Sequence, residues 1–538
     1  MSHSFTSRVV LGALLSILLL AFVVRFANIE NIPVGLYPDE AANGIDALQA
    51  LATGDFKLFY PANFGREGLF INIQAFFISL IGNTVTGLKF ASILFGTLAV
   101  WGIYLLGREL FQRKGAGLIA AFMLATSYWA INFSRIGFRA IMTTFLLTFS
   151  FYFLFRGLRT HKWRDFLLSG LIFGLGLHTY IAFRVAPLIL LLLLPALFLS
   201  YEKFLKRFWK HGLVFALGAF ITAAPMLSYF FITNPEDFAS RSSHISIFAP
   251  EINKGDILGT LSKTFSLSLI KYNFWGDQNW RHNYAPYPVL DPFVGTFFLA
   301  GFLAVLWRTV TLIGLRLREN DRDLRLVRYT FLLASFFVML IPEFLTDEGL
   351  PHALRSIGTQ MPVFLMATIP AFWLYEKALR SLPGTKVAIV SLLICTLGLS
   401  AVFNLTKYFV FFPNTPQASR AFNENYRSMA RYLLLLPDTT RKYVLVDEKG
   451  RNNLSDLPIF AHPVVFLTDQ KVQNMEIIQE NTTIRRNSVL LMLNWNQDLA
   501  GKILKMYPGS TIESIDMNTN REGGEFKVII LPDLTAKK

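Results

Sequence analysis

Long apolar segments separated by short polar loops recur along the chain up to about residue 411. A run of about 20 apolar residues is long enough to cross a bilayer as a helix, and we predict eleven such spans, several of them short or interrupted. They lie near residues 9–27, 88–107, 116–131, 141–156, 166–178, 185–200, 212–232, 293–314, 329–345, 361–376 and 387–405. The first span lacks a small-residue cleavage pattern before Asn28, so we interpret it as a retained anchor.

Two shorter patterns occupy the first long loop, residues 28–87. Pro38 suits the first position of a helix, and apolar residues then recur on one face until Gly54, which predicts a short amphipathic helix. The apolar run 69–82 is too short for a span, and counting it as one would put the basic loops on the wrong side. We therefore interpret it as a helix that lies at the membrane interface or dips into it.

The composition changes after about residue 411, where alternating and amphipathic patterns replace the long apolar runs. We predict a helix at 418–436, strands at 443–447, 464–468, 489–493 and 526–531, and a helix near 499–506. The predicted fold is thus an all-α polytopic membrane protein with about 11 transmembrane helices and a small C-terminal soluble α/β domain. The domains are 1–411, with the first extracytoplasmic loop at 28–87, and 412–538.

Composition supports this fold class and excludes others. Hydrophobic residues make up 53% of the chain, charged residues only 16%, and the mean hydropathy is +0.43, values far too apolar for a soluble globular protein of this length. The 51 Lys and Arg exceed the 36 Asp and Glu, but they lie mostly in short loops, so we expect no nucleic-acid partner. The single cysteine, Cys395, excludes an internal disulfide and a cysteine metal site.

The basic loops distinguish the two faces of the membrane domain. Arginine and lysine cluster after the spans that end near residues 107, 156, 200, 314 and 376, and the positive-inside rule places these loops and the N-terminus in the cytoplasm. The remaining loops hold polar and aromatic sequences at 39–40, 132–139, 178–184, 276–283 and 351–355. We therefore predict an extracytoplasmic site, with the C-terminal domain on the same side because the number of spans is odd.

Asp39 and Glu40 are the leading catalytic candidates, because ionisable residues held at the membrane surface are often functional. In the first turn of a helix, the helix dipole favours the ionised form of Asp39, which could then accept a proton from a hydroxyl. The alternative is structural, because acidic residues stabilise a first turn in any helix. Glu67, just before the interfacial helix, is the third catalytic candidate, and its alternative role is an ion pair with a nearby basic residue.

An enzyme that takes a sugar from a lipid phosphate also needs cations for the leaving phosphate. Arginine suits this role because its planar fork of donors matches phosphate oxygens. The donor-phosphate candidates are Arg281, His282, Arg355, His352, Arg184 and Arg139. For Arg135, Arg139 and Arg184 the alternative is a snorkelling anchor or an internal ion pair, and the two histidines could be ordinary polar loop residues.

These features together resemble the membrane-embedded glycosyltransferases of the GT-C type. The carriers of the resemblance are the Asp-Glu pair in the first external loop, the Phe-Ser-Arg stretch at 133–135 in the second, and many spans followed by a soluble tail. The likeness covers about residues 8–370 and is greatest to bacterial relatives of the protein O-mannosyltransferases and of the lipid A aminoarabinose transferase. It implies Asp39 as catalytic base or acceptor-orienting carboxylate, Glu40 as its neighbour, and a polyprenyl-phosphate sugar as donor.

Two stretches depart from the mannosyltransferase pattern. In that family an acid follows the second-loop arginine, whereas here Ile136 follows Arg135, and the His-Pro-Pro stretch that follows their Asp-Glu is replaced by Gly-Arg-Glu-Gly at 65–68. The acceptor therefore stays open among a lipid, a glycan and a protein hydroxyl. No metal ligand is assigned from the sequence, and a divalent metal stays open as a cofactor.

The expected function is that of an inverting hexosyl- or pentosyltransferase, which moves a sugar from a polyprenyl-phosphate donor to a hydroxyl on the extracytoplasmic face of the plasma (inner) membrane. The alternative from another class is a transporter or flippase of lipid-linked glycans that uses the same arginines as a phosphate path. Transporters typically carry ionisable residues in mid-span and paired repeats, and these spans are nearly free of both. A non-catalytic receptor would leave Asp39 and Glu40 unexplained.

Overall fold

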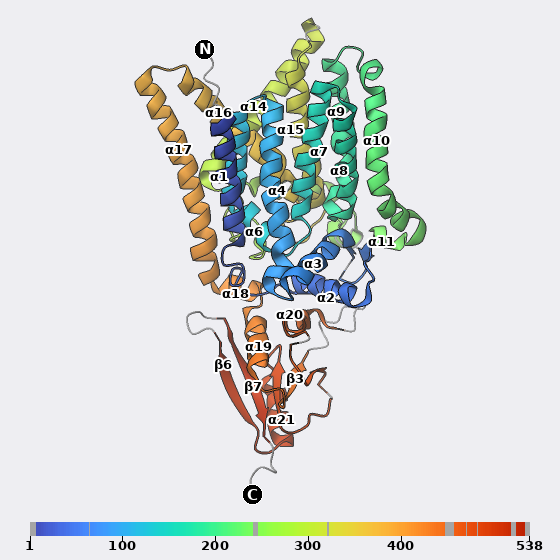
Figure 1. The fold of residues 1–538 in the computed structure, drawn as a ribbon, viewed down its shortest axis with the longest axis vertical. Coiled ribbons are helices and arrows are strands. Elements are labelled where there is room, and N and C mark those ends of the chain that lie inside the picture. Colours follow the sequence, from blue (N-terminus) through green and yellow to red (C-terminus); the bar gives the residue numbers. More distant parts are fainter. Residues whose placement is uncertain are drawn as a thin grey trace. The chain divides into compact units, whose positions relative to one another are not determined.

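The computed structural model in Figure 1 describes residues 7–63, 65–239, 246–319, 322–446, 457–469, 471–480, 482–517 and 523–532. The chain divides into two compact units. The helical unit comprises Met1–Ala27, Glu67–Phe70 and Ala91–Val410, and the mixed unit comprises Asn28–Arg66, Ile71–Phe90 and Phe411–Lys538. The mixed unit therefore joins most of the first long loop to the C-terminal residues, although more than 300 residues separate them in sequence.

Long helices that run side by side build the helical unit (Figure 1). In chain order its helices are α1 (Ser7–Phe26), α4 (Val85–Phe111), α5 (Lys114–Thr126), α6 (Tyr128–Arg135), α7 (Ile141–Thr160), α8 (Trp163–Leu175), η1 (Gly176–His178), η2 (Ile181–Val185), α9 (Pro187–Ser200), α10 (Phe204–Ser228), η3 (Tyr229–Thr233), α11 (Glu236–Ala239), α12 (Pro250–Asn253), α13 (Ile257–Ile270), α14 (Pro292–Glu319), α15 (Leu324–Phe344), η4 (Ile357–Thr359), α16 (Gln360–Leu379), α17 (Pro383–Thr406) and η5 (Lys407–Phe411).

The predicted fold class is confirmed. Within the described residues, nine helices are long and apolar enough to cross a membrane, and the pair α5 and α6, bent by 59°, makes a tenth if it counts as one span. The segment predicted as a span at 166–178 corresponds to α8 followed by η1, and it is shorter than those nine helices. The 13 residues of α8 alone rise about 20 Å.

Glycines let α8 lie very close to α10. A Cβ atom at Gly170 would stand 2.1 Å from the carbonyl oxygen of Phe215, and one at Gly174 would stand 2.1 Å from that of Ala219. Neither position therefore has room for a larger residue without moving a backbone. The close pair α8 and α10 is a tertiary feature that the apolar pattern of α8 alone does not predict.

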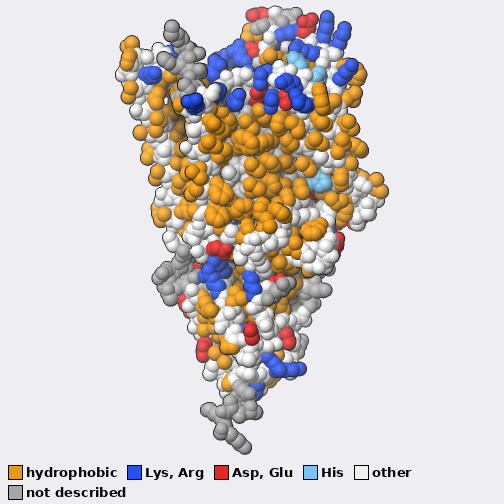
Figure 2. Space-filling model, viewed as in Figure 1, with side chains coloured by type: hydrophobic (Ala, Val, Ile, Leu, Met, Phe, Trp, Pro, Cys, Tyr) orange, Lys and Arg blue, Asp and Glu red, His pale blue; other side chains and the backbone are white. Residues whose placement is uncertain are grey.

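The outer surface of the helical unit is a broad hydrophobic band, visible in Figure 2. Large apolar side chains such as Leu19, Leu303, Trp307 and Leu399 are more than half exposed there. Lys and Arg side chains gather beyond one edge of the band, at the end of the helical unit where α1 begins (Figures 1 and 2). An apolar belt edged by cations is typical of a protein embedded in a bilayer.

The mixed unit contains short helices and a five-stranded sheet. Its elements are α2 (Pro38–Thr53), β1 (Phe59–Tyr60), β2 (Arg66–Glu67), α3 (Gly68–Ile81), η6 (Phe412–Asn414), α18 (Pro416–Ala421), α19 (Glu424–Leu435), β3 (Arg441–Leu445), η8 (Ile459–Ala461), α20 (His462–Thr468), β4 (Met475–Ile478), β5 (Ser488–Met492), α21 (Gln497–Met506), β6 (Thr511–Asp516) and β7 (Glu525–Leu531), with β2 and α3 continuing into the helical unit. The sheet order is β4-β3-β5-β7-β6. The strand β3 pairs in parallel with β4 and with β5, whereas β7 pairs antiparallel with β5 and with β6.

Both faces of this sheet are covered. Alternate strand residues point to opposite sides, so Val444 and Leu491 pack with Leu433 of α19 on one face, while Leu490 and Ile503 pack on the other, where α21 lies. The predicted C-terminal α/β region is thus present, and burial on both faces explains the continuous apolar runs of its central strands.

Residues of the first loop share a core with residues of the C-terminal region. Leu36, Ala47, Ile71 and Leu88 are buried together with Phe466 of α20. The approach is tight, because a Cβ atom at Gly44 in α2 would stand 2.4 Å from the Phe466 ring. The helix α2, with its Asp39 and Glu40, is therefore held in place by α20.

Two predictions for the C-terminal region are wrong. Residues 464–468 belong to the helix α20, not to a strand: Pro463 sits in the first turn, and a short apolar run does not distinguish a helix from a strand. The helix predicted at 418–436 is interrupted at Asn423, whose φ of 53° separates α18 from α19. The strands β4 and β6 were not predicted; both lie at the edges of the sheet, and few of their residues are buried.

Candidate active-site residues

Asp39 lies in the first turn of α2, where the sequence predicts it. Pro38 begins this helix, and Gly54 ends it in the left-handed conformation, donating its N–H to the Ala50 carbonyl. The Asp39 side chain is half-buried, and its Oδ1 accepts a hydrogen bond of 2.8 Å from Asn63 Nδ2. Within the described part of the chain, Oδ2 accepts no hydrogen bond. This oxygen can therefore accept a hydrogen bond, and then a proton, from a substrate hydroxyl.

Glu40 has a different environment, although it is the next residue. Its side chain is completely buried, and its Oε2 lies 3.4 Å from Nζ of Lys89, which is also completely buried. A buried ion pair is strongly destabilising when one partner is removed, because an uncompensated charge remains. The geometry therefore gives Glu40 a structural contact to α4 and leaves Asp39 as the accessible carboxylate of the pair.

Arg66 fixes the loop beside α2. Its guanidinium donates to the Asn43 Oδ1 at 2.8 Å, and it forms a short ion pair with Asp46, both on α2. His462, at the start of α20, feels the same cation. Burial and the Arg66 charge lower the pKa of His462 to about 4, while the charge of Asp39 acts in the opposite direction. His462 is thus a neutral imidazole near Asp39 at neutral pH.

Glu67 joins two of the arginines predicted to bind phosphate. Its Oε2 accepts a hydrogen bond of 2.7 Å from Arg139 Nε, and its Oε1 lies 3.5 Å from Arg184 Nη2. The arginines also contact aromatic rings: Arg139 lies over Tyr180, and Arg184 lies over Phe230. Because the Glu67 side chain is only 2% exposed and both of its oxygens face cations, the ion-pair role considered from the sequence is the one observed.

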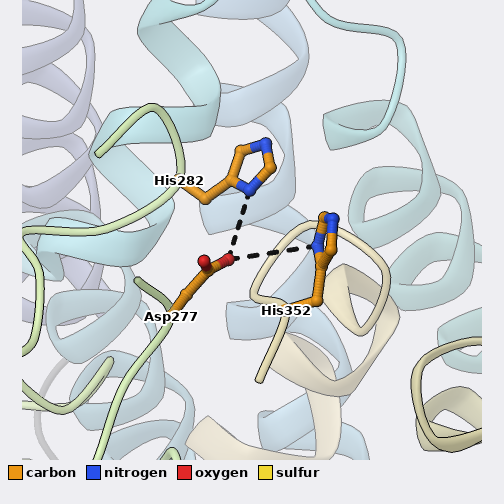
Figure 3. Close-up of side chains that lie close together, drawn as sticks. All are labelled: Asp277, His282 and His352. Atoms are coloured by element: carbon orange, nitrogen blue, oxygen red, sulfur yellow. Dashed lines mark hydrogen bonds and ion pairs between the residues drawn. The ribbon is translucent and has the colours of Figure 1, made fainter. Parts of the chain in front are cut away.

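A buried aspartate links the loops that carry the two predicted histidines (Figure 3). Asp277 Oδ2 lies 3.2 Å from His282 Nδ1 and 3.9 Å from His352 Nδ1, and it accepts a hydrogen bond of 2.7 Å from the Ala353 N–H. Asp277 itself is fully buried, and the His282 ring stacks on Phe133. Two neighbouring loop residues and one distant residue thus form one polar cluster, which we call the Asp277 cluster: Asp277, His282 and His352.

The Asp277 cluster has the donor set of a metal site. The three ligand atoms, one from each side chain, all lie within 4.8 Å of one another. Two imidazole nitrogens and a carboxylate oxygen are ligands that Zn²⁺ accepts, with a fourth position left for water or substrate. Tetrahedral bonds of about 2.1 Å place ligand atoms roughly 3.4 Å apart, close to the spacing between Asp277 and His282. The residues therefore fit a divalent ion, although no metal ligands were assigned from the sequence.

Arg281 and Arg355 lie beside this cluster in sequence but have different partners. Arg355 forms a short ion pair with Glu348 and donates a hydrogen bond of 2.7 Å to Thr346 Oγ1. Arg281 Nε donates to Asn279 Oδ1 at 3.2 Å. The Asp277 cluster brings their loops together, since Ala353 donates to Asp277. That both guanidinium groups bind one phosphate remains a prediction.

Four residues near these candidates carried no role in the sequence analysis. Asn63 and His462 accompany Asp39, Lys89 pairs with Glu40, and Asp277 holds the two histidines. Asp277 had one available signal, because it stands in the polar loop 276–283 together with His282. The others are distant in sequence from the residues that they contact, and only the fold brings them there.

Comparison with protein families connects part of the chain to known glycosyltransferases. Residues 69–229 match the family model described as dolichyl-phosphate-mannose-protein mannosyltransferase. No curated protein sequence matches the chain significantly.

Solved structures extend the likeness to almost the whole chain. ArnT from Cupriavidus metallidurans bound to undecaprenyl phosphate matches with a TM-score of 0.58 and 12% identity, over 96% of this chain and 98% of ArnT. The chain has the GT-C fold. The apo state of the same ArnT gives a TM-score of 0.55 at 12% identity, again over 96% of this chain and 98% of ArnT.

A third solved structure has the same GT-C fold. The apo oligosaccharyltransferase of Archaeoglobus fulgidus matches with a TM-score of 0.51 and 13% identity, over 88% of this chain but only 65% of the archaeal protein. At these identities the structures establish the fold, while chemistry must be argued from the site. The relationship to GT-C membrane glycosyltransferases that the sequence predicts is confirmed.

Proposed function

We propose that this protein is a glycosyltransferase that moves a sugar from a polyprenyl-phosphate donor to a hydroxyl acceptor on the extracytoplasmic face of the membrane. The observation that carries the proposal is the Asp39 carboxylate, which is held by Asn63 through one oxygen while the other is open, at the start of a helix in a chain with the GT-C fold. The matching ArnT structure, which holds undecaprenyl phosphate, supports the donor class.

In the proposed reaction the acceptor oxygen attacks the anomeric carbon of the donor sugar as the bond from that carbon to the phosphate oxygen breaks. The acceptor proton passes to Asp39, and the polyprenyl phosphate leaves with the bonding electrons. A single displacement of this kind inverts the configuration at the anomeric carbon. A positioned general base contributes roughly 100- to 10,000-fold to such a rate.

The leaving phosphate needs positive charge, and the predicted residues fall into two groups. Arg139 and Arg184 share the charge of Glu67, which leaves a net positive charge between them. Arg281 and Arg355 flank the Asp277 cluster, and Arg355 is already paired with Glu348. We assign the donor phosphate to the second group, because the Asp277 cluster brings its two loops together. Arg281 is the leading contact, since its Nε donates to the neutral Asn279 amide, whereas Arg355 is paired with a carboxylate.

We also propose that the Asp277 cluster binds a divalent cation. Asp277, His282 and His352 would hold the ion, which would supply positive charge to a phosphate oxygen when bound. The test is metal analysis of purified protein together with calorimetric Zn²⁺ and Mn²⁺ binding. We expect binding by the wild type and a large loss of affinity in His282→Ala, with Asn279→Ala as the neighbouring control. Equal affinities in both variants would contradict the proposal.

The proposed membrane orientation rests on the distribution of basic residues. We propose that the Lys- and Arg-rich end of the helices and the N-terminus face the cytoplasm of the plasma membrane, and that α2 and the C-terminal region lie outside. Single cysteines at the exposed positions Lys57 and Lys206, in a Cys395→Ser background, test this by labelling intact cells. Labelling at position 206 without labelling at position 57 would overturn the orientation.

The function is tested in a strain that lacks the protein. We expect its polyprenyl-phosphate sugar to accumulate, with the mass identifying the sugar, and we expect wild-type protein but not Asp39→Asn to remove the excess. If Asp39→Asn removes the excess as well as the wild type does, the enzymatic assignment fails, and transport of the lipid-linked glycan becomes the better explanation.

A further inference from the structure

A second chemically distinctive site lies at the opposite end of the helical unit. A pocket of about 510 Å³ is lined by residues at the end of α4, the end of α7, the connection from α9 to α10, and the start of α15. The 20 residues of α7 alone span about 30 Å between Arg139, just before its start, and this pocket. The pocket therefore belongs to the face of the helical unit where Lys and Arg gather in Figure 2, and it is separate from Arg139 and its partner Glu67.

The walls of this pocket combine apolar and cationic side chains. Leu110, Phe155, Leu158 and Val327 form apolar parts of its lining. The cationic part consists of four arginines, at positions 159, 207, 322 and 328, against two glutamates, Glu109 and Glu202. A ligand that fits both parts has an anionic group joined to an apolar body.

The four arginines differ in the hydrogen bonds and ion pairs that their side chains form within the protein. Arg159 forms a forked ion pair with Glu109, and Arg207 is hydrogen-bonded to His161 at 2.6 Å. Burial and the Arg207 charge lower the pKa of His161, so this imidazole adds no positive charge at neutral pH. Within the described residues, Arg322 and Arg328 make no hydrogen bond or ion pair through their side chains. Two guanidinium groups thus remain to bind an anion.

We propose that this pocket binds the phosphate headgroup of an anionic membrane lipid. Guanidinium groups match phosphate oxygens with paired donors. Basic pockets between helices at the cytoplasmic side of a membrane bind such headgroups, and the volume lies within the range of ligand pockets. The apolar wall suits the glycerol and the first part of the acyl chains. Bound there, one lipid would connect the ends of α4, α7 and α15.

The proposal is tested with phosphatidylglycerol as the probe and phosphatidylcholine as the neutral comparison. Full-length protein is purified in mild detergent with each lipid, and retained lipid is counted by native mass spectrometry. We expect the wild type to retain phosphatidylglycerol, and the double variant Arg322→Gln/Arg328→Gln to bind it roughly tenfold more weakly, since charge-assisted hydrogen bonds are lost. The matched control Arg318→Gln removes an exposed arginine outside the pocket and should behave as wild type.

Three results would overturn the proposal. One is equal phosphatidylglycerol retention by the double variant and the control. Another is equal retention of the two lipids by the wild type, a measurement that does not depend on the folding of any variant. The third is displacement of the lipid by millimolar inorganic phosphate, which would identify a free-phosphate site instead. The lysine variant Arg322→Lys/Arg328→Lys keeps the charge and should retain part of the binding. None of these measurements depends on sugar transfer.

Discussion

Asp39 and Glu67 are both acidic residues of the first loop, but their burial and their contacts differ. Asp39 is half-buried and held by one neutral amide, Asn63, with its second oxygen open within the described structure. Glu67 is 2% exposed, and its two oxygens face Arg139 and Arg184. A carboxylate that accepts a proton needs an accessible lone pair, whereas both oxygens of a carboxylate that bridges two cations already face those cations. The difference favours Asp39 for chemistry and Glu67 for holding the arginines in position.

The largest effect is expected at Asp39. The change Asp39→Asn keeps the shape and the hydrogen bond from Asn63 but removes the charge that accepts the proton. We expect turnover by purified enzyme to fall roughly 100- to 10,000-fold, with the midpoint of thermal unfolding nearly unchanged. Near-normal turnover would mean that Asp39 only stabilises the first turn of α2, and the contrast with Glu67 would disappear.

The opposite pattern is expected at Glu67. Replacing it by alanine leaves two largely buried guanidinium groups without their shared anion, which should lower the free energy of unfolding by about 3 kcal/mol. Denaturant titration measures this. The control is Asp55→Ala, which breaks the exposed pair with Lys57 and should cost less than about 1 kcal/mol. Equal stability of the two variants would show that Glu67 is not the anchor inferred here.

Arg281 and Arg355 repeat the comparison among cations. Loss of Arg281 should cost about 2–4 kcal/mol of transition-state stabilisation, and Arg281→Lys should restore only part, because lysine lacks the planar fork. Arg355 already forms an ion pair with Glu348, so Arg355→Ala should cause a smaller loss of transition-state stabilisation. The ratio kcat/KM for the donor measures both, with Arg441→Ala as a distant control. A larger loss at Arg355 would reverse the assignment.

The last expected effect concerns His462, which α20 places near Asp39, and it develops only as the pH falls below neutral. Its pKa is depressed from an ordinary value near 6.5 to about 4, so between these pH values the unfolded chain binds more protons than the folded chain. Stability should therefore fall as the pH drops from 6.5 to 4, by up to about 3 kcal/mol. Unfolding measured across this range should show a weaker pH dependence in His462→Gln. An unchanged dependence would assign the acid sensitivity to other groups.

Several features of the fold were predictable because they depend on neighbouring residues only. The hydropathy of each span, the Pro38 start and the Gly54 end of α2 are local properties, and the structure confirms them. The predicted span at 166–178 corresponds to α8 and η1, but its tight packing on α10 at Gly170 and Gly174 could not be predicted from the hydropathy of the segment. The strand predicted at 464–468 failed because five apolar residues fit either a strand or a helix.

For the candidate site, the sequence identified residue types and left their partners open. The distribution of basic loops and the Asp-Glu motif predicted that Asp39, Glu67, Arg281 and the histidines lie on the extracytoplasmic face. Both signals can be recognised in the linear sequence. Which carboxylate is open and which is paired depended on contacts across many residues: Glu67 with Arg139 and Arg184, Glu40 with Lys89, and Asp277 with His282 and His352. Hydrophobic segments and helix ends depend on residues that are close together in sequence. An ion pair between distant residues requires two elements to pack in one particular arrangement, and only the tertiary structure provides that arrangement.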